Sequence, residues 1–543
     1  MDSKRVILAA VISIVFLLLW DRVVMRKYIP AIPPLETQAV EQTVREPNEA
    51  TAQQAGAPEE TAERELVTIE TPLVTATFSN RGGAMVSYVL KATEANMTEM
   101  PVSMLEDDKG HNGAFLIDVL GRTDLSKAAF KVVPTQEKNQ IHYTYERAGE
   151  FKLTKKYTIR DNEPAVYLTL EWENLSVEGA KIQAEVTSRI DIHAADGQDA
   201  HYTRSYALRG EKLLWKGPGI FSKAPFKKGI YEDGPLQWAG FGERYVTSLF
   251  VNETGPLDNF YWKQNDDDHL IMTARLPALQ LGGHQVKSQE LFLYYGPKSV
   301  KVLREYGADF EKIFWIGKLG FLRVGFLWML NFFYGFLKNY GLAILALTVL
   351  IRVLMSPLMH FSYDSMRKMQ AVQPQLQKMR DKYQDDPQKL NAETMEIFRK
   401  NKVNPFGGCL PMLLQFPIFI AFWQMLYESI ELKGAPFFGW ITDLAAPDQI
   451  ATLPFSLPWF GDVVSVLPVL TTATMLVQQM LTPTTTASKS QKPMMIGMSI
   501  LFGILFYKLP SGVLLYWCAS NVITIVHQMI MFRDKLHLTP HQS

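Results

Sequence analysis

The stretch GLAILALTVLIRVLMSPLM, residues 341–359, places an arginine in the middle of an apolar run. A helix needs roughly 20 residues to cross the hydrocarbon core of a bilayer, and the surrounding segment, residues 339–361, is long enough. Arg352 lies well inside it, and an arginine keeps its proton in proteins. A charge near the centre of a membrane helix costs roughly 3 kcal/mol. We therefore expect Arg352 to face water or a partner instead of lipid.

A second interpretation of Arg352 is that its side chain reaches the cytoplasmic surface. Met359 lies seven residues further along the same helix. At 1.5 Å per residue this is about 10 Å, most of which a long side chain can cover. Polar residues in the later helices favour the first interpretation.

The chain of 543 residues changes character near residue 310. Residues before this point are polar and mixed, whereas long apolar runs dominate after it. The net charge of zero gives no indication of nucleic-acid binding. Both cysteines, Cys409 and Cys518, fall in the apolar part, so the sequence predicts no disulfide in the large polar domain.

The N-terminal segment, residues 1–28, contains a first apolar run from Val6 to Trp20. No small-x-small cleavage site follows it, so we expect an uncleaved transmembrane anchor. Residues 29–64 are rich in Pro, Ala, Glu, Gln and Thr and contain few large apolar side chains. This composition predicts a disordered linker.

Residues 65–310 contain short runs of alternating apolar and polar residues, separated by turn signals such as NRGG and RDNEP. The runs include LVTIET (66–71), FKLTKKYTI (151–159) and AVYLTLEW (165–172). They predict a large antiparallel β-sandwich domain. One loop, DIHAADGQDAH (191–201), offers two histidines and three aspartates. A metal or sugar site is one interpretation of this loop, and an ordinary polar loop is the one we prefer.

Residues 311–338 are apolar and aromatic, with Lys318, Arg323, Asn331 and Lys338 spaced through them. This pattern predicts an amphipathic helix lying in the membrane interface. A spanning helix is the alternative, but it would bring two basic residues to mid-depth.

Residues 362–403 predict a cytoplasmic helical hairpin. Apolar residues recur every three or four positions from Met366 to Tyr383, and Asp386 and Pro387 suit the N-cap and the first position of a second helix. Nine lysines and arginines lie between Arg367 and Lys402. Such an excess of positive charge is typical of cytoplasmic loops.

Residues 404–532 contain four more apolar segments, at about 410–427, 463–481, 494–507 and 513–532. Together with the anchor and the 339–361 helix they predict a polytopic α-helical membrane protein with six transmembrane helices, five of them forming a core. Both termini, including the tail 533–543, would then be cytoplasmic and the β-domain periplasmic.

Polar side chains occur at helical spacing in several of these segments. In the last helix a single face carries Trp517, Asn521, Thr524 and Gln528; Thr348 precedes Arg352 by one turn, and the third helix contains Gln415. Hydrogen bonds from helix to helix would explain such residues. Several polar faces together with one charge, and no carboxylate near the centre, instead favour a shared hydrated cavity.

The motifs NPFGGCLP (404–411), IRVLMSPL (351–358), MLTPTTT (480–486) and LPSGVLLYW (509–517) resemble the YidC/Oxa1/Alb3 family of membrane protein insertases. The N-terminal anchor and large β-domain are similar to the Gram-negative bacterial form. The resemblance implies a β-supersandwich-like periplasmic domain and an insertase and chaperone of the inner membrane that acts alone or with the Sec translocon. The resemblance implies a substrate groove that contains Arg352, Thr348, Gln415, Tyr516 and Trp517. At position 517 this chain departs from the family pattern, which has tyrosine there.

The same resemblance implies that the partners are nascent inner-membrane proteins, the Sec translocon with its accessory subunits and membrane lipids. The tail contains only Arg533 and Lys535 as fixed positive charges, a weak basis for contact with a ribosome, and we expect no direct binding of nucleic acid. No GxxxxGK[ST] motif occurs, and we expect neither a cofactor nor a metal. Two rival classes are a transporter with a periplasmic sensor domain and a membrane-anchored enzyme acting on envelope sugars.

Overall fold

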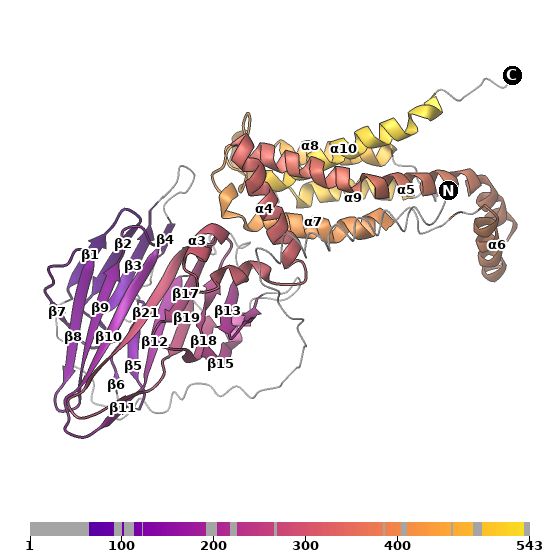
Figure 1. The fold of residues 1–543 in the computed structure, drawn as a ribbon. Coiled ribbons are helices and arrows are strands. Elements are labelled where there is room, and N and C mark those ends of the chain that lie inside the picture. Colours follow the sequence, from indigo (N-terminus) through magenta and orange to yellow (C-terminus); the bar gives the residue numbers. More distant parts are fainter. Residues whose placement is uncertain are drawn as a thin grey trace, which may run out of the picture. The chain divides into compact units, whose positions relative to one another are not determined.

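The computed structural model describes residues 64–91, 100–102, 113–121, 123–191, 203–217, 225–264, 269–383, 386–401, 403, 410–457, 460–481 and 491–536. The predicted anchor, almost all of the predicted linker and the 191–201 loop beyond Asp191 lie outside these residues. The chain divides between Ile313 and Phe314 into a β unit and a helical unit. Figure 1 shows the elements of each unit.

The β unit contains three main antiparallel sheets. The largest has the strand order β14-β13-β16-β17-β21-β10-β9-β8-β7: Lys212–Lys216, Arg204–Arg209, Trp238–Gly242, Val246–Asn252, Val286–Pro297, Ala165–Asn174, Phe151–Ile159, Gln140–Arg147 and Lys131–Val133. The second has the order β15-β18-β19-β12-β5-β6: Ile230–Leu236, Leu257–Gln264, His269–Arg275, Ala184–Asp191, Leu116–Val119 and Thr123–Asp124. The third is β1 to β4: Leu66–Glu70, Val74–Ser79, Ala84–Leu90 and Met100–Val102.

Five smaller elements are described besides these sheets. Strands β11 (Ala180–Ile182) and β20 (Leu279–Leu281) form a two-stranded ribbon. The short helices are η4 (Pro225–Lys228), α3 (Val300–Glu305) and η5 (Phe310–Trp315).

The two smaller sheets of the β unit pack against the largest one. The rings of Phe250 and Phe260 lie 6.3 Å apart across the first interface, and those of Phe78 and Tyr157 lie 4.8 Å apart across the second. Strand β9 alternates buried and partly exposed residues along its whole length, as its sequence predicts for a strand that covers a core on one face. The β-sandwich character expected from the alternating runs is therefore confirmed.

A buried lysine ties two parts of this core together. Lys155 on β9 is fully buried, and its ammonium group donates to the carbonyl oxygens of Gly82 and Phe115, both at 2.7 Å, and of Gly83 at 3.2 Å. Burial lowers the pKa of Lys155 well below its usual value. The three carbonyls compensate for the water that the ammonium loses in the core.

Among its described residues the helical unit contains seven α-helices after residue 319. Their order and bounds are α4 Gly320–Leu337, α5 Tyr340–Lys382, α6 Pro387–Lys400, α7 Leu410–Glu428, α8 Leu467–Leu481, α9 Gln491–Leu505 and, last, α10 Ser511–Leu536, of which α6 is the short second arm of the hairpin. Helix α10 packs against α5, α7 and α8, and α9 packs against α8. Three helices among the described residues are long and apolar enough to cross a membrane, Gly320–Leu337, Tyr340–Lys382 and Ser511–Ile530, and two shorter apolar ones are Leu467–Leu481 and Ile496–Leu505.

Helix α5 continues without a break through the predicted boundary at residue 361. Its 43 residues span about 65 Å at 1.5 Å per residue, roughly twice the thickness of a bilayer core. Pro357 and Pro374 both lie inside the helix and do not end it. The first arm of the hairpin is therefore an extension of the helix that carries Arg352, and Figure 1 shows α6 at its far end.

The second arm of the hairpin begins as its sequence predicts. Asp386 is the N-cap of α6, its carboxylate accepts from the Lys389 amide at 3.0 Å, and a proline occupies the first turn. The two arms share one small core of Met369, Val372, Ile397 and Val403. Little apolar surface holds the hairpin together, which is typical of a locally mobile element.

Both ends of α4 lie at the same end of the helical bundle. Its first turn contains Arg323, which lies beside Glu428 at the end of α7, and only Lys338 separates its last residue from Asn339, the N-cap of α5. The segment that follows α7 reaches the start of α5, where Phe437 packs directly on Gly341. Figure 1 accordingly shows α4 running across α5 and α7.

The apolar segment after α7 is folded and not an open loop. It contains η6 (Ile430–Leu432) and a hairpin of β22 (Ala451–Leu457) and β23 (Gly461–Val464). The buried Asp448 carboxylate accepts from the amides of Val466 and Leu467, at 2.8 and 3.0 Å, and so caps α8. The backbone of the same segment accepts from the amides of Ser511 and Gly512 at the start of α10. This segment, whose purpose the sequence did not reveal, fastens the ends of two core helices.

Candidate functional site: the polar residues around Arg352

Arg352 lies on α5 and faces α10. Its Nε donates to the Ser520 hydroxyl at 2.9 Å, and its Nη2 donates to the same oxygen. The side chain is partly buried, and among the residues that the structure describes no carboxylate lies within ion-pair distance of it. The guanidinium therefore keeps its positive charge next to neutral polar groups.

Tyr516 and Gln415 belong to the same cluster. Tyr516 precedes Ser520 by one turn of α10, and its hydroxyl lies within hydrogen-bonding reach of Ser520 and of Gln415 on α7. Its ring is buried and packs against Phe422, with centroids 4.2 Å apart. Side chains from α5, α7 and α10 thus meet at one point, which we call the Arg352 cluster: Arg352, Gln415, Tyr516 and Ser520.

Thr348 precedes Arg352 by one turn of α5 and is fully buried. Its hydroxyl donates to the carbonyl of Ile344 at 2.6 Å, one turn earlier in the same helix. Thr524 is buried too and donates to the carbonyl of Ser520 at 2.8 Å. A hydroxyl that donates to a carbonyl of its own helix has its donor satisfied without water or another helix.

The predicted polar face of α10 contacts several neighbouring elements. Asn521 donates to Thr474 on α8 at 3.1 Å, and the Trp517 ring lies 4.8 Å from Phe506 and 5.0 Å from Phe419. Gln528, further along, is buried and interacts with Tyr363 on α5. Residues 517, 521 and 528 share a face within about 40°, because an α-helix has 3.6 residues per turn. Helices α5, α7 and α8 all pack on α10, so this face contributes to more than one helix interface.

Reasoning from the sequence missed Ser520, the direct partner of Arg352. The spacing in the sequence could have indicated it, because Ser520 follows Tyr516 by four residues and precedes Thr524 by four, which places all three on one face of the helix. A serine in an apolar helix is common enough that spacing alone does not single it out.

A second arginine pairs with an acid, which the sequence did not suggest. Arg323 on α4 and Glu428 on α7 are both buried, and Nη1 lies 3.7 Å from the carboxylate. Arg323 also donates from Nη2 to the carbonyl of Phe314. Glu428 thus lies at the end of α7, as expected, and is engaged with α4 and not with Arg352.

The described residues contain no group of three or more His, Cys, Asp or Glu that could hold a metal ion. The 191–201 loop is outside them apart from Asp191, so its metal or sugar interpretation stays a prediction.

The apolar helices, the buried polar groups between them and the separate β-sandwich define an integral membrane protein with a large extramembrane domain. Two family models together match nearly all of the described chain: "YidC periplasmic domain" at residues 66–329 and "60Kd inner membrane protein" at residues 332–537. The chain is 31% identical over 97% of its length to a protein of Pelobacter propionicus named membrane protein insertase YidC, covering 98% of that relative. A relative of the same name from Vibrio cholerae is 30% identical, with 98% of each chain covered.

The chain belongs to the YidC family of membrane protein insertases. Its β unit is accordingly a periplasmic domain, its helical unit lies in the inner membrane, and the family is one of insertases and not of enzymes. The expected function is thus confirmed at the level of the family.

Solved structures give weaker comparisons. A crystal structure of an active YidC insertase is 19% identical, with a TM-score of 0.36 and 86% of this chain and 93% of that chain covered. A galactose mutarotase-like protein from Lactobacillus casei is 11% identical, with a TM-score of 0.34 and 43% of this chain and 100% of that chain covered. Neither similarity supports an argument about a site.

Proposed function

We propose that the Arg352 cluster is the substrate site of this insertase. A short polar segment of a nascent inner-membrane protein enters among Arg352, Gln415, Tyr516 and the polar residues of α10, while its apolar helix passes into lipid. Polar contacts along this route lower the cost of moving unsolvated backbone and side chains through the membrane. The observation that supports the proposal is the charge of Arg352, which is bonded to a neutral serine and has no described carboxylate beside it.

Six transmembrane helices form the framework of this proposal: the residues 1–28 anchor, α5, α7, α8, α9 and α10. Helix α4 lies in the outer interface, because both of its ends lie at one end of the bundle. The charge of Arg323 disfavours a spanning position for α4, and in the interface Glu428 neutralises this charge. With six spans, both termini and the α5–α6 hairpin are cytoplasmic.

The proposed cycle needs no nucleotide. Partitioning of apolar segments into lipid and the membrane potential drive insertion. The cytoplasmic hairpin receives the substrate first, and the segment from Ile430 to Val464 closes the outer end of the site. The insertase works by itself or beside the Sec translocon and its accessory subunits, with lipids around it. Any contact with a ribosome would depend on the short tail.

The test of the substrate site uses two model substrates that differ only in the charge of the translocated segment. Arg352→Lys keeps a point charge and should retain most insertion, whereas Arg352→Ala should fail for the acidic substrate and spare the neutral one. Insertion is measured by protease protection in cells that contain each variant at matched levels.

Ser520→Ala separates the charge of Arg352 from its hydrogen bond to α10. It removes the hydrogen-bond partner of Arg352 and leaves the charge, so we expect insertion of both substrates to persist. If Arg352 only braces α5 against α10, Ser520→Ala and Arg352→Lys should each impair both substrates and lower thermal stability. Equal loss for the two substrates with every variant of Arg352 would refute the substrate role.

A further inference from the structure

The β22–β23 hairpin, which directly precedes α8, exposes large apolar side chains. Phe455 on β22 is 58% exposed, and Ile450, the residue before this strand, is 53% exposed. Residues 449–461 contain no charged residue. An exposed apolar stretch without charges is typical of a surface that contacts a protein or a membrane.

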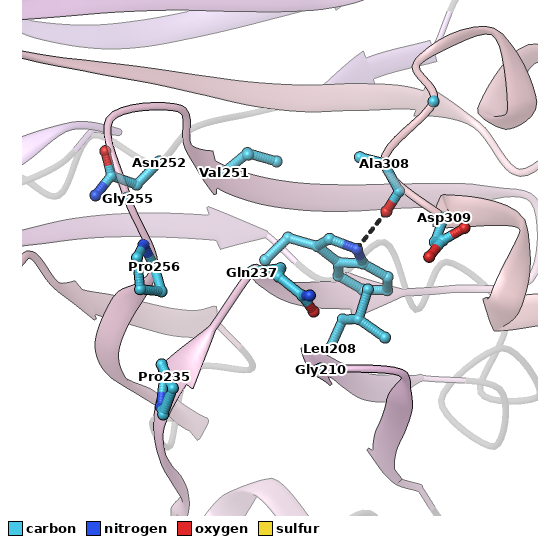
Figure 2. Close-up of a pocket in the computed structure, with 12 residues that line it drawn as sticks. Leu208, Gly210, Pro235, Gln237, Val251, Asn252, Gly255, Pro256, Ala308 and Asp309 are labelled. Atoms are coloured by element: carbon cyan, nitrogen blue, oxygen red, sulfur yellow. Dashed lines mark hydrogen bonds between the residues drawn. The ribbon is translucent and has the colours of Figure 1, made fainter. Parts of the chain in front are cut away.

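The large rings of the β unit, by contrast, are covered. Every phenylalanine among its described residues is buried. Trp238, which lines the hollow drawn in Figure 2, is 1% exposed, and its Nε1 donates to the Ala308 carbonyl at 2.7 Å. This unit lies in the water of the periplasm, where an exposed ring is unfavourable. The exposed ring of Phe455 therefore favours surroundings other than water for the β22–β23 hairpin.

The base of the β22–β23 hairpin is fixed to the ends of two helices. The hydroxyl of Tyr507, two residues after α9, accepts from the Ser465 amide and donates to the Val463 carbonyl, both at 3.0 Å. The ring of Tyr507 packs edge-on against Phe460, with centroids 4.8 Å apart. Helix α8 begins two residues after Ser465. The β22–β23 hairpin is therefore held at the start of α8 and the end of α9.

Apolar side chains of these two helices extend the exposed surface of the β22–β23 hairpin. The start of α8 and the end of α9 are neighbours, because Thr472 packs on Gly503. Val469 and Leu505, near the same two ends, are both exposed. In a bundle that crosses a membrane such outward side chains face lipid, which is as apolar as they are. The β22–β23 hairpin thus adjoins a lipid-facing surface.

The backbone of the β22–β23 hairpin limits how deep it can lie. The two strands form a sheet of their own, so among the described residues each has an edge without a partner strand. Where β23 has one residue, the exposed Asp462, β22 has four, residues 453–456 with Phe455 among them. Unpaired backbone groups and a carboxylate need water or headgroups and do not enter hydrocarbon. The strands therefore suit the headgroup region, from which a side chain can reach the acyl chains.

We propose that the β22–β23 hairpin binds the outer leaflet of the membrane. Its strands lie among the phospholipid headgroups, and the side chains of Phe455 and Ile450 lie at the start of the acyl chains. Zwitterionic phospholipid is sufficient, because residues 449–461 are uncharged. A protein partner is disfavoured, since a stable interface buries about 800 Å² on each side, far more than these two side chains supply. The contact holds the outer end of α8 at a fixed depth.

The experiment measures the depth of an environment-sensitive fluorophore on the full-length protein in nanodiscs of phosphatidylcholine and phosphatidylethanolamine. Serine replaces both native cysteines, and the fluorophore is attached to one new cysteine, at Phe455→Cys, Val477→Cys or Asp462→Cys. Val477 is exposed and lies ten residues, or about 15 Å, from the start of α8, near the middle of a bilayer core. Phospholipids with a spin label near the headgroup end or near the methyl end of an acyl chain quench from a known depth, and iodide quenches from water.

We expect the fluorophore at position 455 to be quenched most by the spin label near the headgroup and to be protected from iodide. The fluorophore at position 477 should be quenched most by the spin label near the methyl end. The fluorophore at position 462 should be quenched most by iodide. Addition of anionic phosphatidylglycerol should change none of these results.

A second pair of variants tests the ring of Phe455 itself. With the fluorophore at Ile450→Cys, the additional change Phe455→Ser should lower quenching by the lipid spin label and raise quenching by iodide, because it removes the larger apolar side chain. Thr452→Ser is the matched control on the same strand, since Thr452 is exposed too, and it should leave both kinds of quenching unchanged. Equal effects of the two substitutions would overturn the role of Phe455.

Two further results would overturn the proposal. The first is iodide quenching at position 455 as strong as at position 462, which would place the β22–β23 hairpin in water. The second is protection of position 455 from iodide and from both lipid spin labels, which would mean that a second copy of the chain covers the ring.

The proposal uses the six-span framework proposed above and not the substrate role of Arg352. Loss of lipid quenching at position 477 as well as at position 455 would refute the framework and the proposal together. Loss at position 455 alone would refute only the proposal. Neither result depends on insertion activity, so a failure of the substrate role of Arg352 is distinguishable from both.

Discussion

Removing Glu428 should release α4 from the helical bundle. Arg323 and Glu428 are 6% and 7% exposed, and 3.7 Å separates Arg323 Nη1 from the carboxylate. In Glu428→Leu the guanidinium would stay buried with its charge uncompensated. Breaking a buried ion pair from one side costs about 3–5 kcal/mol.

The double variant Arg323→Met/Glu428→Leu should recover most of this loss. It removes both charges and puts apolar side chains of similar length in their place, an exchange that is often neutral. What remains is the lost bond from Arg323 to the Phe314 carbonyl, worth about 1 kcal/mol. The double-mutant cycle should therefore show a coupling energy of several kcal/mol between the two positions.

The assay is reversible unfolding of the purified protein in mixed detergent micelles, followed by tryptophan fluorescence. The matched control is the exposed pair Lys400–Glu396 on α6, with 2.8 Å between its charged atoms, where Glu396→Leu should change stability little. A loss below about 1 kcal/mol in Glu428→Leu, or a double variant as unstable as the sum of the single ones, would refute the reasoning.

Further predictions concern the pH response, the outer segment, the hairpin and the β unit. Burial, followed by neighbouring carboxylates, raises the pKa of Asp118 from 3.8 to about 6, so the native state binds this proton more tightly and the contribution of Asp118 to stability is largest below about pH 4. As pH rises through 6, the free energy of unfolding should fall by about 1–2 kcal/mol after allowance for solvent screening. Hydrogen exchange of β5 and β12 in the intact chain measures this loss. In Asp118→Asn the pH dependence should disappear. An unchanged dependence would contradict the assignment. Asp448→Ala should cost about 2–4 kcal/mol, because it removes the cap of α8 and the acceptor of the partly buried Trp440 indole. Asp448→Asn should cost less, and equal melting temperatures of the two variants would argue against the cap. A cysteine at the exposed Met395 should crosslink to a nascent chain before cysteines near Arg352 do, and no crosslink at any stage would leave the hairpin a structural element. Deleting residues 66–300 should leave insertion largely intact, and a stable, correctly anchored deletion that fails to rescue depleted cells would show otherwise.

Local patterns in the sequence predicted the elements well. Alternation identified β9 and β10, because a strand that covers a core on one face buries every second residue. The N-cap at Asp386 followed from side-chain chemistry that acts within one turn. The end of α5 was less predictable, because the change from apolar to polar residues at 361 marks where a helix leaves the membrane and not where it stops.

The partners of the polar residues depended on the tertiary structure. The sequence by itself determined that Arg352 lies in an apolar helix. Because its charge cannot be lost, it also determined that the side chain needs polar or hydrated surroundings. Only the packing of α5 on α10 decided that Ser520 would bond to it, and only the course of α4 across the bundle brought Arg323 to Glu428. Helical periodicity determines the face on which a residue lies, but several neighbours compete for that face, and the crossing of the helices selects among them.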